Sequence, residues 1–383
     1  MLLTDKGYIS MSSVKFLFPI DGDVLMPADG KISGESLLVK ATLAAEDGSR
    51  VTVNEKEATF VRALGNGISE YEIELSIDGY RNALDARAEK NGEVSSTVVY
   101  VYRFKNAYKK YRLAIDDIIW SVRELAEMSK VYKSIFDCPF FAIFRRLNRD
   151  FGTKVQLNVY FTDLEGFDLT MMPDCYKEEF IANSNWMKIT FHAYADKPDR
   201  IYRFSPYSEL YRDYNLVTDE IIRFAGKESM NTSANGLHWA ETTVEGARAL
   251  RACGINCLVG YFIFDDNGDP HVAYYLNEEQ TKHCFDRDFW VDNKEGIIFS
   301  KDKIVLDAFP LDKIASRLDY LRDERPTEAG IMNFVTHEQY FYKKYEAYQP
   351  DYEEKIRTAC AWAQRNGYEP CFISDVIKEE YPF

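Results

Sequence analysis

The sequence predicts a protein of two domains, an all-β N-terminal domain followed by a larger α/β domain. The chain has 383 residues, more than one hydrophobic core usually serves. Short alternating runs of apolar and polar residues, separated by glycine-containing turns, recur over the first third of the sequence. Apolar runs of strand length then alternate with segments of helical periodicity, which is typical of a parallel sheet. We therefore expect a domain at 1–108 and a second at 109–383.

The N-terminal domain is expected to contain short strands joined by tight turns. Turn signals such as Asp21-Gly22, Asp47-Gly48 and Asn91-Gly92 separate these strands. Strands at this spacing, without intervening helical segments, predict a β-sandwich. The pair Gly65-x-Gly67 does not open a helix, so a turn is favoured over a phosphate-binding loop. The expected strands are residues 14–19, 37–43, 50–53, 71–75 and 96–102.

The second domain is expected to alternate strands with helices, so that its sheet is parallel and closes into a barrel. In such folds, functional residues gather at the carboxyl ends of the strands. Thr242-x-x-Glu245 matches a capping box at the start of one helix. The expected strands are residues 112–115, 155–161, 187–191, 255–264, 331–336 and 370–373. The expected helices are residues 118–130, 138–151, 174–182, 216–227, 243–253, 311–322 and 351–365.

Composition excludes several classes of function. The net charge of −15 disfavours nucleic acid as a partner, because a surface of that sign repels phosphate backbones. No apolar run reaches membrane-spanning length, and the first residues lack the basic and apolar regions of a signal peptide, so we expect a cytoplasmic protein with no membrane contact. The seven scattered cysteines are interpreted as reduced thiols.

Acidic and histidine side chains stand where predicted strands end. Asp116 and Asp117 end the first strand of the second domain, and His192 ends the strand at 187–191. Asp196 follows His192 by four residues. If a helix begins there, the two side chains share one face, a spacing that suits two ligands of one metal ion.

Two further histidines belong to the same pattern. His337 ends the strand at 331–336, and His238 lies in another strand-end segment beside Trp239. Convergence of these groups predicts metal-assisted hydrolysis, in which a divalent cation lowers the pKa of water and polarises a carbonyl. A free carboxylate would take the proton of the water and a histidine would return one to the leaving group.

The order of these residues resembles that in the polysaccharide deacetylases of the NodB homology type. It runs from Asp116-Asp117 to His192, with a possible ligand four residues on, and ends at Thr336-His337. The resemblance covers roughly residues 112–375. It implies a distorted (β/α) barrel that removes acetyl groups from N-acetylated or O-acetylated sugars with a divalent metal. The N-terminal segments 51–58, 71–75 and 83–88 resemble the immunoglobulin-like accessory domains attached to carbohydrate-active enzymes.

The resemblance implies a role for each matching residue. Asp116 corresponds to the catalytic base and His337 to the general acid. Metal ligation falls to Asp117, His192 and Asp196. A carbohydrate substrate would contact Tyr194, His238 and Trp239, because aromatic and imidazole rings suit sugar rings.

This sequence departs from the family pattern at two places. Asp196 stands where the family has a second histidine, and the harder donor set shifts the expected metal from zinc toward manganese, iron or magnesium. The Arg-x-Pro-Tyr segment of the family is absent, and Leu237-His238-Trp239 stands at the corresponding place.

Two other functions remain open on the sequence. The chain could be a catalytically inactive carbohydrate-binding or scaffolding protein on a deacetylase-like barrel. It could also be a glycoside hydrolase with paired carboxylates. Structural roles also compete: Asp116 and Asp117 could cap a helix, and His271 and His283 are assigned to structural positions. The turn at 266–269 starts like a calcium loop but lacks its glycine and glutamate, so calcium is rejected.

Overall fold

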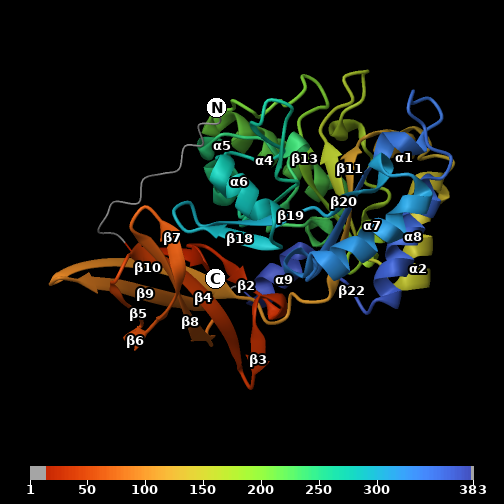
Figure 1. Cartoon of the computed structure of the whole chain (residues 1–383). Helices are drawn as coiled ribbons and strands as arrows, with labels where there is room; N and C mark the ends of the chain where they lie inside the picture. Colours follow the sequence, from red (N-terminus) through yellow and green to blue (C-terminus); the bar gives the residue numbers. More distant parts are fainter. Residues whose placement is uncertain (1–13, 381–383) are drawn as a thin grey trace. The chain divides into compact units, whose positions relative to one another are not determined.

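The computed structural model describes residues 14–380 and divides the chain into two compact units. Unit 1 comprises the described residues up to Lys105 together with Val291–Lys294, and unit 2 comprises Asn106–Trp290 and the described residues from Glu295 onward (Figure 1). The multidomain organisation of strands and helices expected from the sequence is confirmed at this level. The inclusion of residues 291–294 in unit 1 was not expected. No helix in the described part of the chain is long and apolar enough to span a membrane.

Unit 1 consists of two five-stranded sheets. The pairs of the first sheet are antiparallel, and so are those of the second sheet, except that β2 pairs parallel to β10. The first sheet contains β1 (Lys15–Phe18), β3 (Lys31–Ser33), β4 (Ser36–Glu46), β7 (Thr59–Gly65) and β8 (Ile68–Ile77). The second contains β2 (Val24–Leu25), β5 (Arg50–Val53), β6 (Lys56–Glu57), β9 (Arg81–Lys90) and β10 (Glu93–Arg103).

The local sequence explains both the turns and the core of unit 1. Asn91 and Gly92 join β9 to β10, and both have positive φ (51° and 84°), as a two-residue hairpin of type I′ requires. Strand β4 buries alternate residues such as Val39 and Ala41, because successive side chains point to opposite faces. These residues pack with residues of the second sheet, such as Leu84, in one hydrophobic core.

Unit 2 contains two sheets whose recorded strand pairs are parallel, and one short hairpin. The larger sheet contains β11 (Lys110–Ile118), β12 (Val155–Tyr160), β13 (Met187–Ala193), β20 (Ile304–Val305), β21 (Ile331–His337) and β22 (Glu369–Pro370). The smaller contains β14 (Ala234–Asn235), β15 (Cys257–Gly260), β18 (Phe289–Asp292) and β19 (Ile297–Lys301). The hairpin consists of β16 (Ile263–Phe264) and β17 (Pro270–His271).

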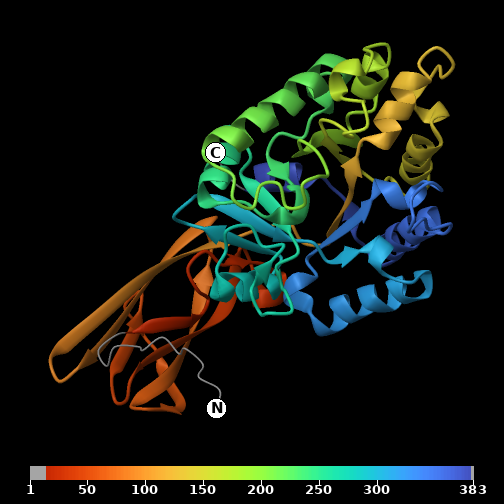
Figure 2. The ribbon, with the colours of Figure 1, turned by 90° about the horizontal axis from the view of Figure 1, so that it is seen from above.

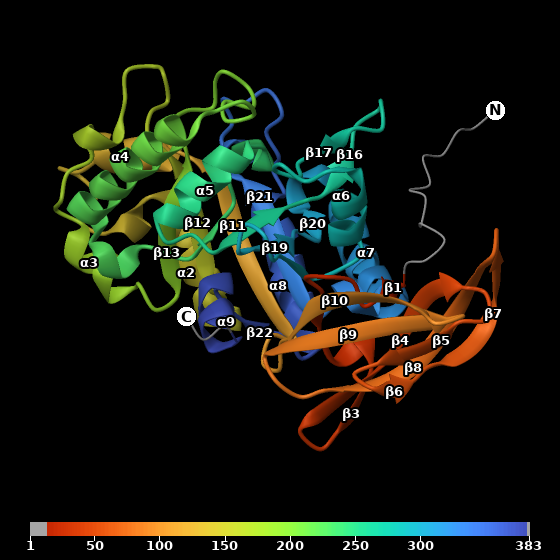
Figure 3. The same ribbon diagram turned by 90° about the vertical axis from the view of Figure 1, so that its left-hand side faces the viewer.

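Helices connect these strands and cover their outer side (Figures 2 and 3). Buried strands such as β12, in which all six residues are buried, therefore have apolar neighbours on their outer face. One hydrophobic core includes residues of the strands and of the covering helices. The helices are α1 (Trp120–Glu127), α2 (Pro139–Phe151), α3 (Lys177–Ala182), α4 (Tyr207–Ala225), α5 (Val244–Ala252), α6 (Glu278–Phe285), α7 (Leu311–Glu324), α8 (Tyr352–Arg365) and α9 (Ile373–Glu380).

Two contacts connect the parallel sheets of unit 2. Ile189, in the edge strand β13 of the larger sheet, forms a parallel bridge with Met230, which precedes β14 of the smaller sheet. Beyond β19, the backbone N–H of Lys303 donates to the carbonyl of Asn333 in β21. The strand order is β13-β12-β11-β21-β20 in one sheet and β14-β15-β19-β18 in the other. All carboxyl ends of the paired parallel strands therefore lie on the same side.

Several predicted elements have different limits in the structure. The strand expected at 112–115 extends to Ile118, so the helix expected from 118 begins only at Trp120. The strand expected at 255–264 is divided into β15 and β16. The strand expected at 370–373 is wrong: β22 has two residues and is followed by α9. The apolar residues at this point pack one side of a helix, a pattern that a short window cannot distinguish from a strand.

The first turn of α1 is fixed by a buried carboxylate from the end of β21. Glu338 is 1% exposed, and its two oxygens accept the backbone N–H groups of Ile119, Trp120 and Ser121 at 2.7–2.8 Å. These N–H groups have no partner within the helix, and a negative charge is favourable at a helix N-terminus. Glu338 therefore joins α1 to the strand end that carries His337.

We expect Glu338→Ala to lower the free energy of unfolding by roughly 2–3 kcal/mol, because three buried backbone donors lose their shared acceptor. Urea unfolding followed by circular dichroism measures this loss. Glu346→Ala provides a matched control at an exposed position and should change stability by less than about 0.5 kcal/mol. Equal effects of the two substitutions would contradict the assigned role of Glu338.

Candidate metal centre

Both acidic residues at the end of β11 reach the same cavity because the strand is irregular there. Ile115 pairs with Leu157 and Ile118 pairs with Val159, so β11 has one extra residue opposite β12. This is a β-bulge. Asp117 lies in the bulge with φ of 63°, a left-handed conformation that Asp tolerates better than most residues. The bulge interrupts the strict alternation of side chains, and Asp116 and Asp117 both line the cavity.

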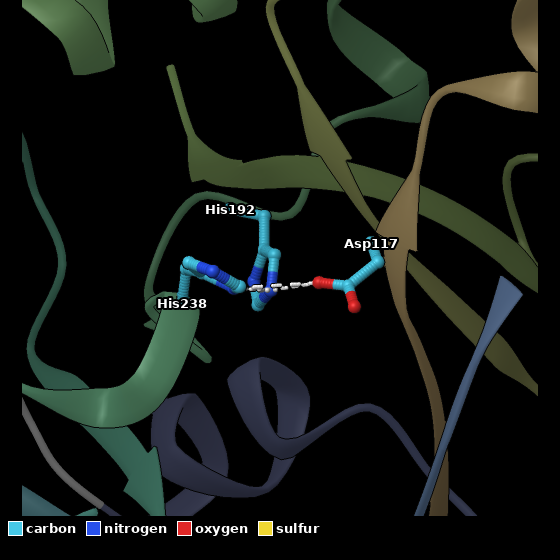
Figure 4. A group of neighbouring side chains, drawn as sticks. All are labelled: Asp117, His192 and His238. Carbon is cyan, nitrogen blue, oxygen red and sulfur yellow. Dashed lines mark hydrogen bonds and ion pairs between the residues drawn. The ribbon is translucent and has the colours of Figure 1, made fainter. Parts of the chain in front are cut away.

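Asp117, His192 and His238 form the one group of potential metal ligands found among the described residues. Asp117 comes from β11 and His192 from β13, and His238 comes from a short 3-10 helix that follows β14 (Figure 4). Both histidines are nearly completely buried. The side chains point toward one another from three different elements (Figure 4).

The spacing of the three ligand atoms matches a tetrahedral cation. Asp117 Oδ1 lies 3.1 Å from His192 Nε2 and 3.3 Å from His238 Nδ1, and the two nitrogens are 3.3 Å apart. Bonds of about 2.0–2.1 Å in tetrahedral geometry place two ligand atoms about 3.4 Å apart. Two imidazoles and one carboxylate also form a donor set that catalytic zinc sites use. The residues present therefore fit a divalent metal.

Neighbouring groups orient these ligands. His192 Nδ1 donates to the carbonyl of Gly236 at 2.7 Å, which leaves Nε2 free to accept or to bind a cation. The hydroxyl of Tyr160 donates to Asp117 Oδ1 and lies 2.9 Å from His238 Nδ1. Gln339 Nε2 donates to the other oxygen of Asp117 at 2.9 Å. Each ligand is therefore held by at least one further contact.

The charges of this group are strongly coupled. Burial by itself would raise the pKa of the Asp117 carboxyl, but hydrogen bonds with His192 and His238 hold it well below its usual value. Burial opposes a charged His192, but the carboxylates of Asp116 and Asp117 outweigh it and raise the pKa of the imidazole.

The structure places Asp196 and Tyr194 differently from the positions expected from the sequence. The expectation that His192 and Asp196 share a helical face is wrong, because the chain forms a loop after β13 and the next helix begins at Tyr207. Asp196 is outside the group of ligands, and its Oδ1 lies 3.7 Å from His238 Nε2. Tyr194 stacks on Phe161 with ring centroids 5.3 Å apart and does not line the cavity, which contradicts its expected contact with substrate.

His337 lies at the end of β21 and is paired with a buried carboxylate. Its Nδ1 lies 3.0 Å from Oδ1 of Asp307, which also accepts from the hydroxyl of Thr336 at 2.7 Å. Burial opposes the protonated imidazole, but the charge of Asp307 outweighs it and raises the pKa of His337 to about 10. His337 is therefore protonated at neutral pH. It pairs with Asp116 in the register of β11 and β21.

The three potential metal ligands and His337 line one cavity of about 700 Å³. This volume lies within the range of small-molecule sites. The structure brings seven of the eight predicted site residues together in the lining of this cavity, which are Asp116, Asp117, His192, Asp196, His238, Trp239 and His337. The other lining residues that enter the argument below are Arg112, Tyr160, Asp163, Glu165, Lys197, Asp199, Asp302 and Gln339.

Sequence reasoning missed Tyr160, which lines this cavity, and two residues that contact its lining, Asn158 and Asp307. Tyr160 and Asn158 lie in a strand predicted only as apolar, although the alternation Gln156-x-Asn158-x-Tyr160 is a polar row on one face of that strand. Asp307 carries no comparable signal, because its contact with His337 joins residues 30 positions apart. Only the folded chain shows that pair.

Comparison with protein-family models gives no match, and comparison with curated proteins gives none either. Among solved structures, the endo-β-1,4-mannanase of Thermotoga petrophila aligns with 26% of this chain at 16% identity and a TM-score of 0.19, and the chain spans 21% of its length. A protein from Bacteroides fragilis provisionally described as an α-galactosidase aligns with 94% of this chain and 80% of its own, at 8% identity and a TM-score of 0.25. The amylomaltase of Corynebacterium glutamicum covers 92% of this chain and 42% of its own, at 10% identity and a TM-score of 0.17. None of these TM-scores indicates a shared overall fold, so function must be argued from the site.

The ligand assignment is tested by comparing His238→Ala with Asp196→Ala. We expect His238→Ala to weaken binding of Zn²⁺ or Mn²⁺ by more than about 100-fold, because it removes one of three ligand atoms. Asp196→Ala should retain the metal with at most about tenfold weaker binding, because the contact of Asp196 with this group is to Nε2 of His238, which is not one of the three candidate ligand atoms. Isothermal titration calorimetry on metal-free protein measures both. The opposite order of effects would restore Asp196 as a ligand.

The pair of His337 and Asp307 makes stability depend on pH. The raised pKa of His337 means that its contribution is complete below about 6.5 and is lost as pH rises through about 10. Asp307, whose pKa is lowered because the charge of His337 outweighs burial, contributes only above about 4.

We therefore expect wild type to exceed His337→Asn in free energy of unfolding by about 1–2 kcal/mol near pH 6, a modest value because the His337 side chain is 29% exposed. The difference should disappear near pH 10. Urea unfolding at several pH values measures it, and a difference that grows with pH would contradict the pairing.

Proposed function

We propose that this protein is a metal-dependent hydrolase that removes an acetyl group from a carbohydrate. The observation that carries the proposal is the position of three functional groups around one cavity. The group Asp117, His192 and His238 can hold a divalent cation, the free carboxylate of Asp116 lies beside it, and the protonated His337 also lines the cavity. Metal-assisted hydrolysis of an amide or ester uses these three functions.

The third ligand in this proposal is His238 and no longer Asp196. The exchange of a carboxylate for an imidazole softens the donor set relative to the one expected from the sequence, so zinc and iron become at least as suitable as manganese, and magnesium becomes less suitable. The resemblance to polysaccharide deacetylases included a second histidine that this sequence lacks at position 196. We infer that His238, which lies on a different element, replaces it.

Each residue has a defined task in the proposed reaction. A divalent cation bound to the three ligands would polarise the acetyl carbonyl and activate water. Asp116 accepts the proton of the attacking water. His337, held protonated by Asp307, donates a proton to the nitrogen or oxygen of the departing sugar. Tyr160 and Gln339 keep Asp117 in the orientation that the metal requires.

The lining of the cavity favours a neutral sugar as the substrate. Seven acidic side chains line it, against three cationic ones, Arg112, Lys197 and the protonated His337. This negative balance disfavours phosphorylated or uronic sugars. Trp239, beside His238, is 38% exposed and has a left-handed φ of 60°, a strained conformation of a kind that clusters at binding sites. Its indole offers a flat surface on which the apolar face of a sugar ring can stack.

The fold expected from the resemblance enters this proposal as well. We infer that the two parallel sheets of unit 2 form one interrupted (β/α) barrel, supported by the bridge between Ile189 and Met230 and the bond from Lys303 to Asn333. We also infer that unit 1 is an immunoglobulin-like sandwich, supported by its two sheets around a single core.

The two alternative functions differ from the proposal in measurable ways. A carbohydrate-binding protein without activity would bind acetylated oligosaccharides but release no acetate. A glycoside hydrolase would release reducing ends, and it would need two free carboxylates. Asp117 does not qualify as one of them, because two imidazoles, Tyr160 and Gln339 engage it.

The decisive experiment measures acetate release from N-acetylated and O-acetylated oligosaccharides by protein reconstituted with Zn²⁺, Mn²⁺ or Fe²⁺. We expect a chelator to abolish release. Asp116→Asn should lower kcat by about 100- to 10,000-fold, because the general base is lost, and should leave the metal content unchanged. Asp219→Asn, an exposed position on α4, is the matched control and should behave as wild type. Binding without acetate release, or release that chelation does not affect, would contradict the proposal.

A further inference from the structure

A row of buried amides extends from Asp116 into the interior of unit 2. Gln156 and Asn158 are two residues apart on β12 and therefore share one face. Asn158 Nδ2 donates to Asp116 Oδ1, Gln156 Nε2 donates to Asn158 Oδ1 at 2.7 Å, and Asn231 Nδ2 donates to Gln156 Oε1 at 2.6 Å. All three amides are at most 2% exposed. We call Asn231, Gln156 and Asn158 the amide chain.

The direction of every bond in the amide chain follows from the carboxylate at its end. A carboxylate oxygen only accepts hydrogen bonds, so Asn158 must turn its NH₂ group toward Asp116. Its carbonyl oxygen then faces Gln156, which must present its own NH₂ group. The same argument fixes the orientation of Asn231. One charge therefore determines which way three amide dipoles point, and their positive ends all face Asp116.

The far end of the chain shows that this direction has a cost. Among the described residues, no group donates to Asn231 Oδ1, although the atom is buried. An unsatisfied buried acceptor is unfavourable, and apolar side chains would fill the interior of a strand at lower cost. The amide chain thus directs its NH₂ groups toward Asp116, and its unsatisfied acceptor, Asn231 Oδ1, lies at the end remote from the cavity.

The backbone of Gly236 packs against the side-chain amide of Asn158. A Cβ atom on Gly236 would lie 3.3 Å from Asn158 Nδ2, tighter than ordinary van der Waals contact. The carbonyl of the same residue accepts the hydrogen bond of His192. The backbone at Gly236 therefore packs against the donor of Asp116 and orients a metal ligand at the same time.

We propose that the amide chain is a positioning device for the general base. It holds Asp116 Oδ1 in one place and leaves Oδ2, to which no described side chain donates, for the proton of the attacking water. Asn158 is the residue in contact with Asp116, and Gln156 and Asn231 act through it. This inference rests on the proposed function, in which Asp116 is the base. It adds three residues, none of which lines the cavity.

The first test removes the links of the chain with apolar residues of similar shape. Asn158→Leu should lower kcat by about 10- to 100-fold, the usual effect of losing a partner that orients a functional group. Gln156→Met should have a smaller effect and Asn231→Leu the smallest, while KM and metal content stay as in wild type. A kcat within about twofold of wild type for Asn158→Leu would overturn the proposal. So would losses of kcat that follow the melting temperatures of the variants and not their distance from Asp116.

The second test reverses the direction of the chain from its remote end. In Asn231→Asp, a protonated acid can still donate to Gln156, but the ionised acid can only accept and forces Gln156 to turn. The kcat of Asn231→Asp, divided by that of wild type, should therefore fall at least tenfold as pH rises. The same ratio for Asn231→Leu should not change with pH. Parallel pH profiles of the two variants, with both folded by circular dichroism, would overturn the inference.

A third measurement separates this inference from the proposed function. If wild-type protein releases no acetate from any acetylated sugar, the proposed function fails, and the amide chain is then judged by structure alone. Crystal structures of Zn²⁺-loaded wild type and Asn158→Leu should show a rotated Asp116 carboxylate in the variant. An unmoved carboxylate would overturn the positioning role whether or not the protein is an enzyme.

Discussion

The buried carboxylate of Asp117 is the interaction on which the arrangement of the cavity depends. An ionised group removed from water must be compensated, and here the compensation comes from His192, His238, Tyr160 and Gln339. These partners lie on four different elements besides β11. Because each must reach the same carboxylate, the positions of two strand ends and two 3-10 turns are fixed relative to one another. A cation bound to this group would take over that compensation from a proton.

The β-bulge at Asp116 and Asp117 explains how one dipeptide serves two purposes. In a regular strand, adjacent side chains point to opposite faces, and one of the two carboxylates would enter the hydrophobic core. The extra residue and the left-handed conformation of Asp117 turn both toward the cavity. The two carboxylates then acquire different surroundings. Asp117 is engaged by imidazoles, whereas Asp116 is held by one amide and keeps an oxygen available for chemistry. In the proposed function, this difference in surroundings lets one residue type serve both as a metal ligand and as a base.

The two strands on either side of β11 supply side chains that line the cavity or contact its lining. Strand β12 contributes Asn158 toward Asp116 and Tyr160 toward Asp117, so residues two apart in sequence support two different functions. Strand β21 contributes His337, whose partner Asp307 also binds the backbone N–H of that residue. Glu338, the next residue, caps α1. The polar groups that would otherwise destabilise the interior of the unit are thus paired with one another, which is why a packed core and a charged cavity coexist.

The sequence by itself determined the alternation of strands and helices, the two-part organisation, and the strand ends at which Asp116, Asp117, His192 and His337 stand. These features depend on local periodicity and on the rule that parallel strands end at one edge, and both can be read from a single chain. Only the tertiary structure places His238, and not Asp196, beside the potential metal ligands Asp117 and His192. The local sequence does not decide whether a helix or a loop follows His192, because that depends on packing against the rest of the unit. The tertiary structure alone decided the pairing of His337 with Asp307 and of Asn231 with Gln156, since hydrogen bonds between residues 30 and 75 positions apart leave no local pattern in the sequence.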